Sequence, residues 1–317
     1  MTKGIDEKSR LIQKITTELG WDVDINLILD RIKQLDNGLI QEDEFIYLLN
    51  WSDRFTLIHK LEQIQIPSTA KRDYIIPDLL VIHNDNGKET PYLIEIKTSK
   101  DTKLSWSEKY YKSLINYSKK VNIPLLIAWK CNTFDIWTLF DITLFEKPNL
   151  NYKIDIEKAI KQNMLSIFAG DYIVIAYEHF SLNFKFKKIT KKLVKGNEID
   201  YSVSLESFYY IGKDNKRIES LNPSYFALII GMFSEEVIEE DDNFINIKYI
   251  PNNTLIYIQT LILNLTKGIA NSNNIKWIEL AKEKKYLFEY VTFLELLKKG
   301  IKEEIFDKIM LTIPYGS

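Results

Sequence analysis

The sequence predicts a mixed α/β fold, in which a sheet with flanking helices occupies the first part of a 317-residue chain. Two apolar, β-branched runs at residues 74–82 and 92–97 are joined by a polar turn that contains glycine, which is typical of a β-hairpin. An amphipathic helical pattern over about 105–121 follows, and then two strand-like runs at 124–130 and 133–140. Two strands, a helix and two strands is an order that suits a mixed sheet with helices packed on it.

The composition is that of a water-soluble globular protein, with 45% hydrophobic and 27% charged residues. The formal net charge of −2 does not by itself indicate a nucleic-acid-binding protein. The single cysteine, Cys131, excludes a disulfide within one chain and a cysteine-based zinc cluster. No apolar run is long enough to span a membrane and the N-terminus lacks the apolar core of a signal peptide, so we expect a cytoplasmic protein with no membrane partner.

Three polar residues interrupt the hairpin. Asp78 lies on the first strand, and Glu95 and Lys97 lie two residues apart on the second. Side chains two apart on a strand share a face, so Glu95 and Lys97 stand side by side while Ile94 and Ile96 face the other way. If the strands pair, Asp78 lies near them. Two carboxylates and a lysine are costly to bury in apolar surroundings unless a cation and a function hold them there.

The run Pro77-Asp78 followed by Glu95-Ile96-Lys97 resembles the signature of the PD-(D/E)XK nuclease superfamily, which includes restriction endonucleases and Holliday-junction resolvases. The resemblance implies a restriction-endonuclease-like core, a central mixed sheet flanked by helices. It implies that Asp78 and Glu95 hold Mg²⁺, with Mn²⁺ as a substitute, and that Lys97 orients or helps to deprotonate the attacking water.

Magnesium prefers oxygen ligands and keeps several waters, so two carboxylates with waters and a phosphate oxygen suffice, and the carbonyl oxygen of Ile96 is a further candidate ligand. A bound metal also lowers the pKa of a water and stabilises charge on a phosphoryl group. The alternative is an exposed hairpin on which Glu95 and Lys97 form an ordinary surface pair.

A third acid has two candidates. Residues 6–20 form an amphipathic helical pattern that resembles the first helix of type I restriction nuclease domains, and in several members of the superfamily a Glu on such a helix joins the active site. Glu7 is therefore one candidate. Glu44, at the charged start of a helical pattern over 41–49, is its rival. Acids are also ordinary at helix N-termini, so a solvated helix start is the alternative for both.

Lysines suggest where phosphates could bind. The helix over 105–121 carries lysines opposite an aromatic stripe that includes Tyr110, and residues 184–195 hold six lysines and no acid. We predict sequence-independent contacts with phosphates; a lysine-guarded sheet edge is the alternative for the second segment. The predicted nucleic-acid-binding residues are Lys109, Lys112, Lys185, Lys187, Lys188, Lys191 and Lys192.

Gly196-Asn197 follows the lysine-rich segment and is typical of a boundary. We therefore expect a nuclease domain over residues 1–195 and an α+β domain of unknown fold over 196–317. The second domain would serve in recognition, sensing or oligomerisation. Its apolar pattern at 254–266 is too short to span a bilayer and predicts a core or interface helix.

The function predicted from the sequence is a metal-dependent endonuclease that hydrolyses DNA phosphodiester bonds in restriction or anti-phage defence, with RNA left open as a substrate. One alternative is a repair or recombination nuclease, such as a resolvase or a transposase-associated enzyme. Another is a catalytically silent scaffold subunit on a nuclease fold. Cleavage of both strands needs two active sites, so we expect a homodimer, and a defence role would add a partner protein.

Overall fold

The computed structural model describes residues 41–61, 73–171, 173–176, 180–193, 199–212, 215–218, 233–251 and 255–272, with short further pieces at 277, 295, 298–302 and 306–309. The chain divides into two compact units. The first comprises residues 1–162 with 281–283, and the second comprises 163–280 with 284–317. Glu7 and the helix predicted over residues 6–20 lie outside the described residues.

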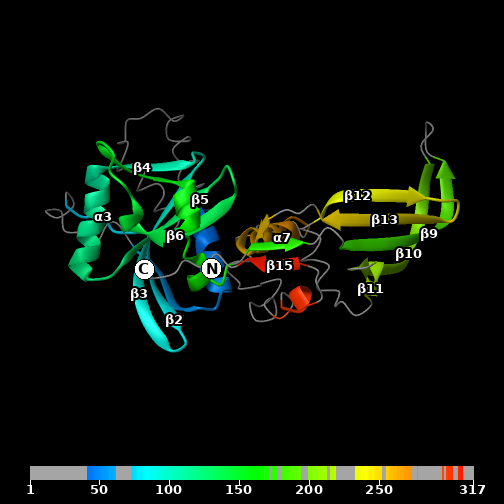
Figure 1. The fold of residues 1–317 in the computed structure, drawn as a ribbon, viewed down its shortest axis with the longest axis horizontal. Coiled ribbons are helices and arrows are strands. Elements are labelled where there is room, and N and C mark those ends of the chain that lie inside the picture. The colour runs from blue at the N-terminus through cyan, green and yellow to red at the C-terminus, as the bar shows by residue number, and fades with distance from the viewer. Residues whose placement is uncertain are drawn as a thin grey trace, which may run out of the picture. The chain divides into compact units, whose positions relative to one another are not determined.

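The first unit is built on a five-stranded sheet with the order β1-β2-β3-β5-β6 (Figure 1). The pairing of β3 with β5 is parallel and the other pairings are antiparallel, so the sheet is mixed, as predicted. Its strands are β1 (Phe55–Lys60), β2 (Leu79–Asp85), β3 (Lys88–Ser99), β5 (Leu125–Cys131) and β6 (Ile136–Asp141).

The tight turn between β2 and β3 fixes their register. Asn86 and Gly87 have positive φ angles of 50° and 91°, which the two central positions of a type I′ hairpin turn require. The side chain of Asn84 accepts a hydrogen bond from the Gly87 N–H at 2.8 Å. From this turn the pairing runs to Leu79 opposite Ile94.

Helices cover both faces of this sheet. Residues 41–51 are helical, and Phe45 on this helix packs against Trp137 of β6 with ring centroids 4.9 Å apart. On the other face lies α3 (Glu108–Val121), which Ser107 caps by accepting a hydrogen bond from the Tyr110 N–H. Every residue of β5, the strand between these layers, is buried. The predicted sheet with flanking helices is therefore confirmed.

Smaller elements support α3. Strands β4 (Lys103–Ser107) and β7 (Asn151–Asp155) form a two-stranded antiparallel sheet next to the start of the helix. The rings of Tyr111 and Tyr152 stack with centroids 3.7 Å apart, which ties α3 to β7. The unit is completed by η2 (Ile142–Leu144) and α4 (Ile156–Lys161).

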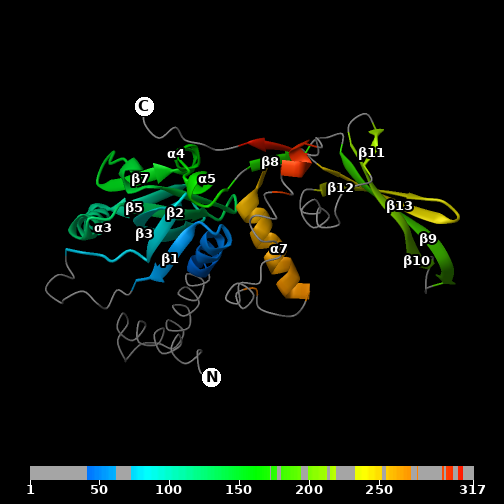
Figure 2. The same ribbon diagram turned by 90° about the horizontal axis from the view of Figure 1, so that it is seen from below.

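The second unit contains two sheets and a long helix. A three-stranded sheet has the order β14-β8-β15, and a five-stranded antiparallel sheet has the order β11-β10-β9-β13-β12 (Figure 2). We call the larger one the distal sheet. Its strands are β9 (Ser181–Leu193), β10 (Ile199–Ile211), β11 (Arg217–Ile218), β12 (Phe233–Glu240) and β13 (Phe244–Pro251). The remaining elements are α5 (Leu165–Phe168), β8 (Ile173–Ala176), β14 (Leu255–Tyr257), α7 (Ile258–Ser272) and β15 (Phe306–Ile309).

The structure changes one expectation for the second half and bears out most of another. The division between the units falls after Gln162, not after residue 195, because the lysine-rich strand β9 pairs with β10 and β13. The apolar pattern at 254–266 is a short strand followed by α7, whose Leu261, Ile262 and Leu263 are buried. No helix in the described part of the chain is long and apolar enough to cross a membrane.

Candidate active site

The register of β2 and β3 brings Asp78, Glu95 and Lys97 together. Because Leu79 pairs with Ile94, Asp78 comes opposite Glu95 at the end of β2. The Asp78 carboxylate accepts a hydrogen bond from the Ile96 N–H at 2.7 Å, which holds it against β3. On the same face, Lys97 Nζ lies 2.5 Å from Glu95 Oε1. The structure thus unites the three residues that the signature predicted.

Tyr110 belongs to this cluster as well. It lies in the first turn of α3, and its hydroxyl donates a hydrogen bond to Glu95 Oε1. The Lys97 ammonium lies 5.4 Å from the centre of the Tyr110 ring. The sequence placed Tyr110 only in an aromatic stripe. Its position at the start of the helix that follows the lysine strand was the available signal.

Burial and like charge dominate the electrostatics. Burial, and then the negative charge of Asp78, raise the pKa of Glu95 to about 7, against the opposing effects of Lys97 and Tyr110. Burial lowers the pKa of Lys97, but Glu95 and Asp78 raise it by more, so the net pKa lies above its usual range. Burial, and then Glu95, raise the pKa of Tyr110.

The donor atoms fit a divalent cation. Glu95 is 2% exposed, and its Oε1 accepts hydrogen bonds from Lys97 and Tyr110. Its other oxygen, Oε2, is buried and has no hydrogen-bond partner among the described residues. An unpaired buried carboxylate oxygen beside a second carboxylate is unfavourable, and a cation would satisfy it. Hard cations such as Mg²⁺ and Mn²⁺ take carboxylate oxygens and complete their shells with water.

No third acid joins this pair within the described residues, where no cluster of three or more His, Cys, Asp or Glu side chains occurs. Glu44 is buried on the other face of the sheet. Its Oε1 lies 2.5 Å from Lys130 Nζ and accepts a hydrogen bond from Trp137 Nε1 at 2.8 Å. Lys130 pairs with Thr98, the neighbour of Lys97, so it points away from the Lys97 face.

The structure therefore does not bring Glu44 to Asp78 and Glu95, and we do not retain it as a metal ligand. Glu44 is not a solvated helix start either, because it is 2% exposed. It neutralises Lys130, which also lies 2.9 Å from Asp135. Glu44 thus forms a buried ion pair that joins the helix over 41–51 to the sheet.

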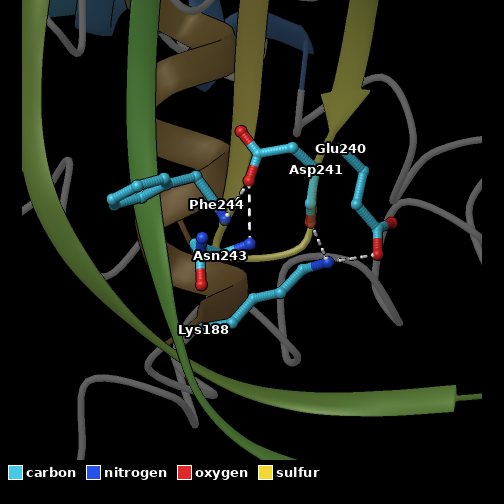
Figure 3. A network of polar contacts seen from close by, with 5 residues as sticks. All are labelled: Lys188, Glu240, Asp241, Asn243 and Phe244. Atoms are coloured by element: carbon cyan, nitrogen blue, oxygen red, sulfur yellow. Dashed lines mark hydrogen bonds and ion pairs between the residues drawn. The ribbon is translucent and has the colours of Figure 1, made fainter.

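The predicted phosphate-binding lysines fall into three groups. Lys109 and Lys112 are exposed on α3, where Lys112 pairs with Glu108 at 2.6 Å. Lys185 and Lys187 lie on β9 of the second unit, whereas the side chains of Lys191 and Lys192 lie outside the described residues. Lys188 is 8% exposed and bonds to the Glu240 carboxylate and to the Asp241 carbonyl, each at 2.6 Å (Figure 3). Lys188 therefore stabilises the turn between β12 and β13.

Comparisons with known proteins find a family and a solved structure similar to part of the chain. Residues 62–169 match a family described as "Archaeal holliday junction resolvase (hjc)", and this range contains Asp78, Glu95, Lys97 and Tyr110. Among solved structures, the chain is similar to a Holliday junction resolvase, Hjc, from the archaeal hyperthermophile Archaeoglobus fulgidus. The identity is 19% and the TM-score is 0.33, with 42% of this chain and 96% of that chain covered. A comparison with curated protein sequences gives no match.

In metal-free buffer, the free energy of unfolding is predicted to fall as the pH rises from about 4.5 to about 7. The pKa of Glu95 is about 7 in the fold and 4.5 in the unfolded chain, so the folded protein binds the extra proton in this window. This contribution is fully present below pH 4.5 and is lost as the pH rises through 7, over a range of roughly 3 kcal/mol. Urea denaturation in EDTA at pH 5 and pH 7.5 measures it. Glu95→Gln is the control because it removes the titrating carboxyl at an equal side-chain size, and an equal pH dependence of the two would contradict the prediction.

Glu44→Gln is predicted to lower the free energy of unfolding and to leave the rate of DNA cleavage unchanged. The substitution removes a charge that neutralises the buried Lys130, which costs about 3 kcal/mol for a broken buried pair. Urea denaturation measures the loss, with Glu157→Gln at an exposed carboxylate as the matched control. Cleavage of DNA by Glu44→Gln, at a temperature where the protein is folded, should equal that of the wild type. Normal stability together with lost cleavage would indicate that Glu44 is a metal ligand after all.

Proposed function

We propose that the first unit carries a nuclease core of the PD-(D/E)XK superfamily and is a metal-dependent endonuclease that hydrolyses DNA phosphodiester bonds in recombination or repair. One observation carries the proposal: Asp78, Glu95 and Lys97 lie together, and the buried Oε2 of Glu95 has no hydrogen-bond partner among the described residues. The Holliday-junction resolvase family over residues 62–169 favours recombination over the restriction or defence role that the sequence first suggested. No observation favours a defence partner.

Each residue has a distinct task in this chemistry. Asp78 and Glu95 would hold Mg²⁺ or Mn²⁺, with the Ile96 carbonyl as a further ligand. The metal supplies Lewis acidity, which stabilises charge on the phosphoryl oxygens and activates a bound water. Lys97 and Tyr110 both bond to Glu95 Oε1, so they fix the carboxylate and leave Oε2 for the metal. The Lys97 side chain is 31% exposed, so its ammonium can also donate to a water or a phosphate at the surface.

A second copy of the chain is part of the proposal. One unit of this kind presents one set of Asp78, Glu95 and Lys97, whereas resolving a DNA junction or cutting a duplex requires one cleavage on each of two strands. A dimer with two-fold symmetry supplies two sites in a fixed relation. The silent-scaffold alternative is disfavoured because the complete set is costly to bury and nothing in the packing of the sheet requires it.

Alanine at either carboxylate is predicted to abolish cleavage. Asp78→Ala or Glu95→Ala removes a metal ligand, and the expected loss of rate is about 100-fold or more. Lys97→Ala should lose cleavage to a similar extent and retain metal binding. Cleavage of supercoiled plasmid and of a synthetic four-way junction in Mg²⁺, Mn²⁺ or EDTA measures the rate, and calorimetric titration with Mn²⁺ measures binding. Glu157→Ala, at an exposed acid, is the control. If Asp78→Ala cuts as fast as the wild type, the site is assigned wrongly.

The two substrates also separate the biological roles. A recombination nuclease should cut the four-way junction at least about tenfold faster than a duplex of the same sequence, because the branched structure is its target. Equal rates on both would argue for a restriction-type or general nuclease with the same active site. Cleavage of either substrate requires the metal and Lys97. The comparison of the two rates therefore tests the biological role and not the assignment of the active site.

A further inference from the structure

The two faces of the distal sheet differ in chemistry. Alternation along the paired strands places Phe184, Phe186 and Phe208 on one face, together with Ile247, which pairs with Phe184. Ring contacts between Phe184 and both Phe186 and Phe208 confirm that these three share a face. Lys188 and its partner Glu240 belong to this apolar face too. On this face, Lys188 is already bonded to Glu240 and to the Asp241 carbonyl.

The opposite face, which we call the basic face, is polar and positively charged. Lys185 pairs with Asn246, and Lys187 pairs with Phe244, across β9 and β13. Lys248 pairs with Asn183 one step further along the same two strands. On the other side of β9, the serines at 204 and 207 stand opposite Lys187 and Lys185. Lys187 and Lys248 are exposed.

Aromatic rings hold two of the cations in place. Lys185 Nζ lies 3.8 Å from the centre of the Phe244 ring, and the guanidinium of Arg217 lies 4.4 Å from the centre of the Tyr209 ring. Arg217 is exposed and comes from β11 at the edge of the sheet. A guanidinium stacked on a ring presents its N–H fork in a fixed plane, and stacking reduces the conformational entropy lost when it pairs with a phosphate.

The charge balance of this face is opposite to that of the whole chain. Among the described side chains it holds Lys185, Lys187, Lys248 and Arg217 against Glu206 and Glu239. The Lys185–Glu206 pair, at 3.1 Å, is exposed on both sides, and such pairs contribute little and exchange readily for a phosphate. The formal charge of the chain is −2, so the basic face is a local concentration of positive charge.

We propose that the basic face of the distal sheet, formed by Lys185, Lys187, Lys248 and Arg217, binds the sugar-phosphate backbone of DNA outside the active site. The inference rests on the proposed function, since it takes DNA as the substrate. It revises the predicted lysine set, because Lys188 belongs to the opposite face and Lys248 and Arg217 join. Contacts of this kind hold DNA of any sequence, and they release counterions, so they make affinity strongly dependent on salt.

The test measures DNA binding by the full-length protein as a function of salt. Fluorescence anisotropy with a labelled four-way junction in Ca²⁺, which should support binding without efficient hydrolysis, gives the slope of log affinity against log salt. The double variant Lys187→Thr/Lys248→Thr keeps residues suited to strands and removes two exposed cations. Each lost phosphate contact lowers the slope by about 0.9, so between 50 and 200 mM salt the double variant should lose about 12-fold less affinity than the wild type.

Two controls separate this result from general effects. Lys298→Ala/Lys302→Ala removes two exposed lysines elsewhere in the second unit and should leave the slope unchanged. Lys188→Met should lower the melting temperature, because it removes the bonds of Lys188 to the Glu240 carboxylate and the Asp241 carbonyl, and should also leave the slope unchanged. An unchanged slope in Lys187→Thr/Lys248→Thr, or weaker binding with no change in slope, would overturn the proposal.

The outcome for the wild type distinguishes this inference from the proposed function. If the wild type binds and cuts the junction but the slope of the double variant equals that of the charge-matched control, the basic face is wrong and the nuclease assignment stands. If the wild type binds no DNA in Ca²⁺ and cuts none in Mg²⁺, the proposed function fails, and the basic face fails with it.

Discussion

The register of one hairpin governs the first unit. The Asn86-Gly87 turn sets β2 against β3, and this pairing carries Asp78 to a position opposite Glu95. Because side chains alternate with a period of two, a slip of one residue would turn Glu95 and Lys97 to the other face of the sheet. The hydrogen bond from the Ile96 N–H to Asp78 then fixes the second carboxylate. Parallel pairing with the fully buried β5 holds β3 in the centre of the sheet, so the site stands on a rigid strand.

Two buried glutamate–lysine pairs lie on opposite faces of this sheet, and they differ in one respect. Glu44 and Lys130 neutralise each other, while Trp137 donates a hydrogen bond to Glu44 and Asp135 lies beside Lys130. This pair therefore serves the packing of the helix over 41–51 on the sheet. Glu95 and Lys97 leave a buried carboxylate oxygen without a partner and stand beside a second acid. An arrangement that is incomplete without a cation is unfavourable for a structural pair and useful for a metal-dependent enzyme.

The same alternation sorts the charges of the second unit. A lysine-rich strand looks uniform along the chain, but its side chains alternate between two faces. Lys188 of β9 lies on the apolar face, where it stabilises the turn at Asp241, whereas Lys185 and Lys187 lie on the basic face. Cations from β11 and β13 are added by pairing. Binding surfaces built this way combine residues that are far apart in the chain, so their charge is not visible in any one segment.

The sequence by itself determined the order of strands and helix in the first unit and the identity of Asp78, Glu95 and Lys97, because both depend on spacings of a few residues and on a turn encoded locally. It did not determine which face Glu44 joins, that the Tyr110 hydroxyl reaches Glu95, or that β9 belongs with β10 and β13. An acid at a helix start and a run of lysines have the same pattern whether they serve packing, chemistry or DNA. Only the pairing of distant strands sets which of these side chains share a face and which of them lose contact with water.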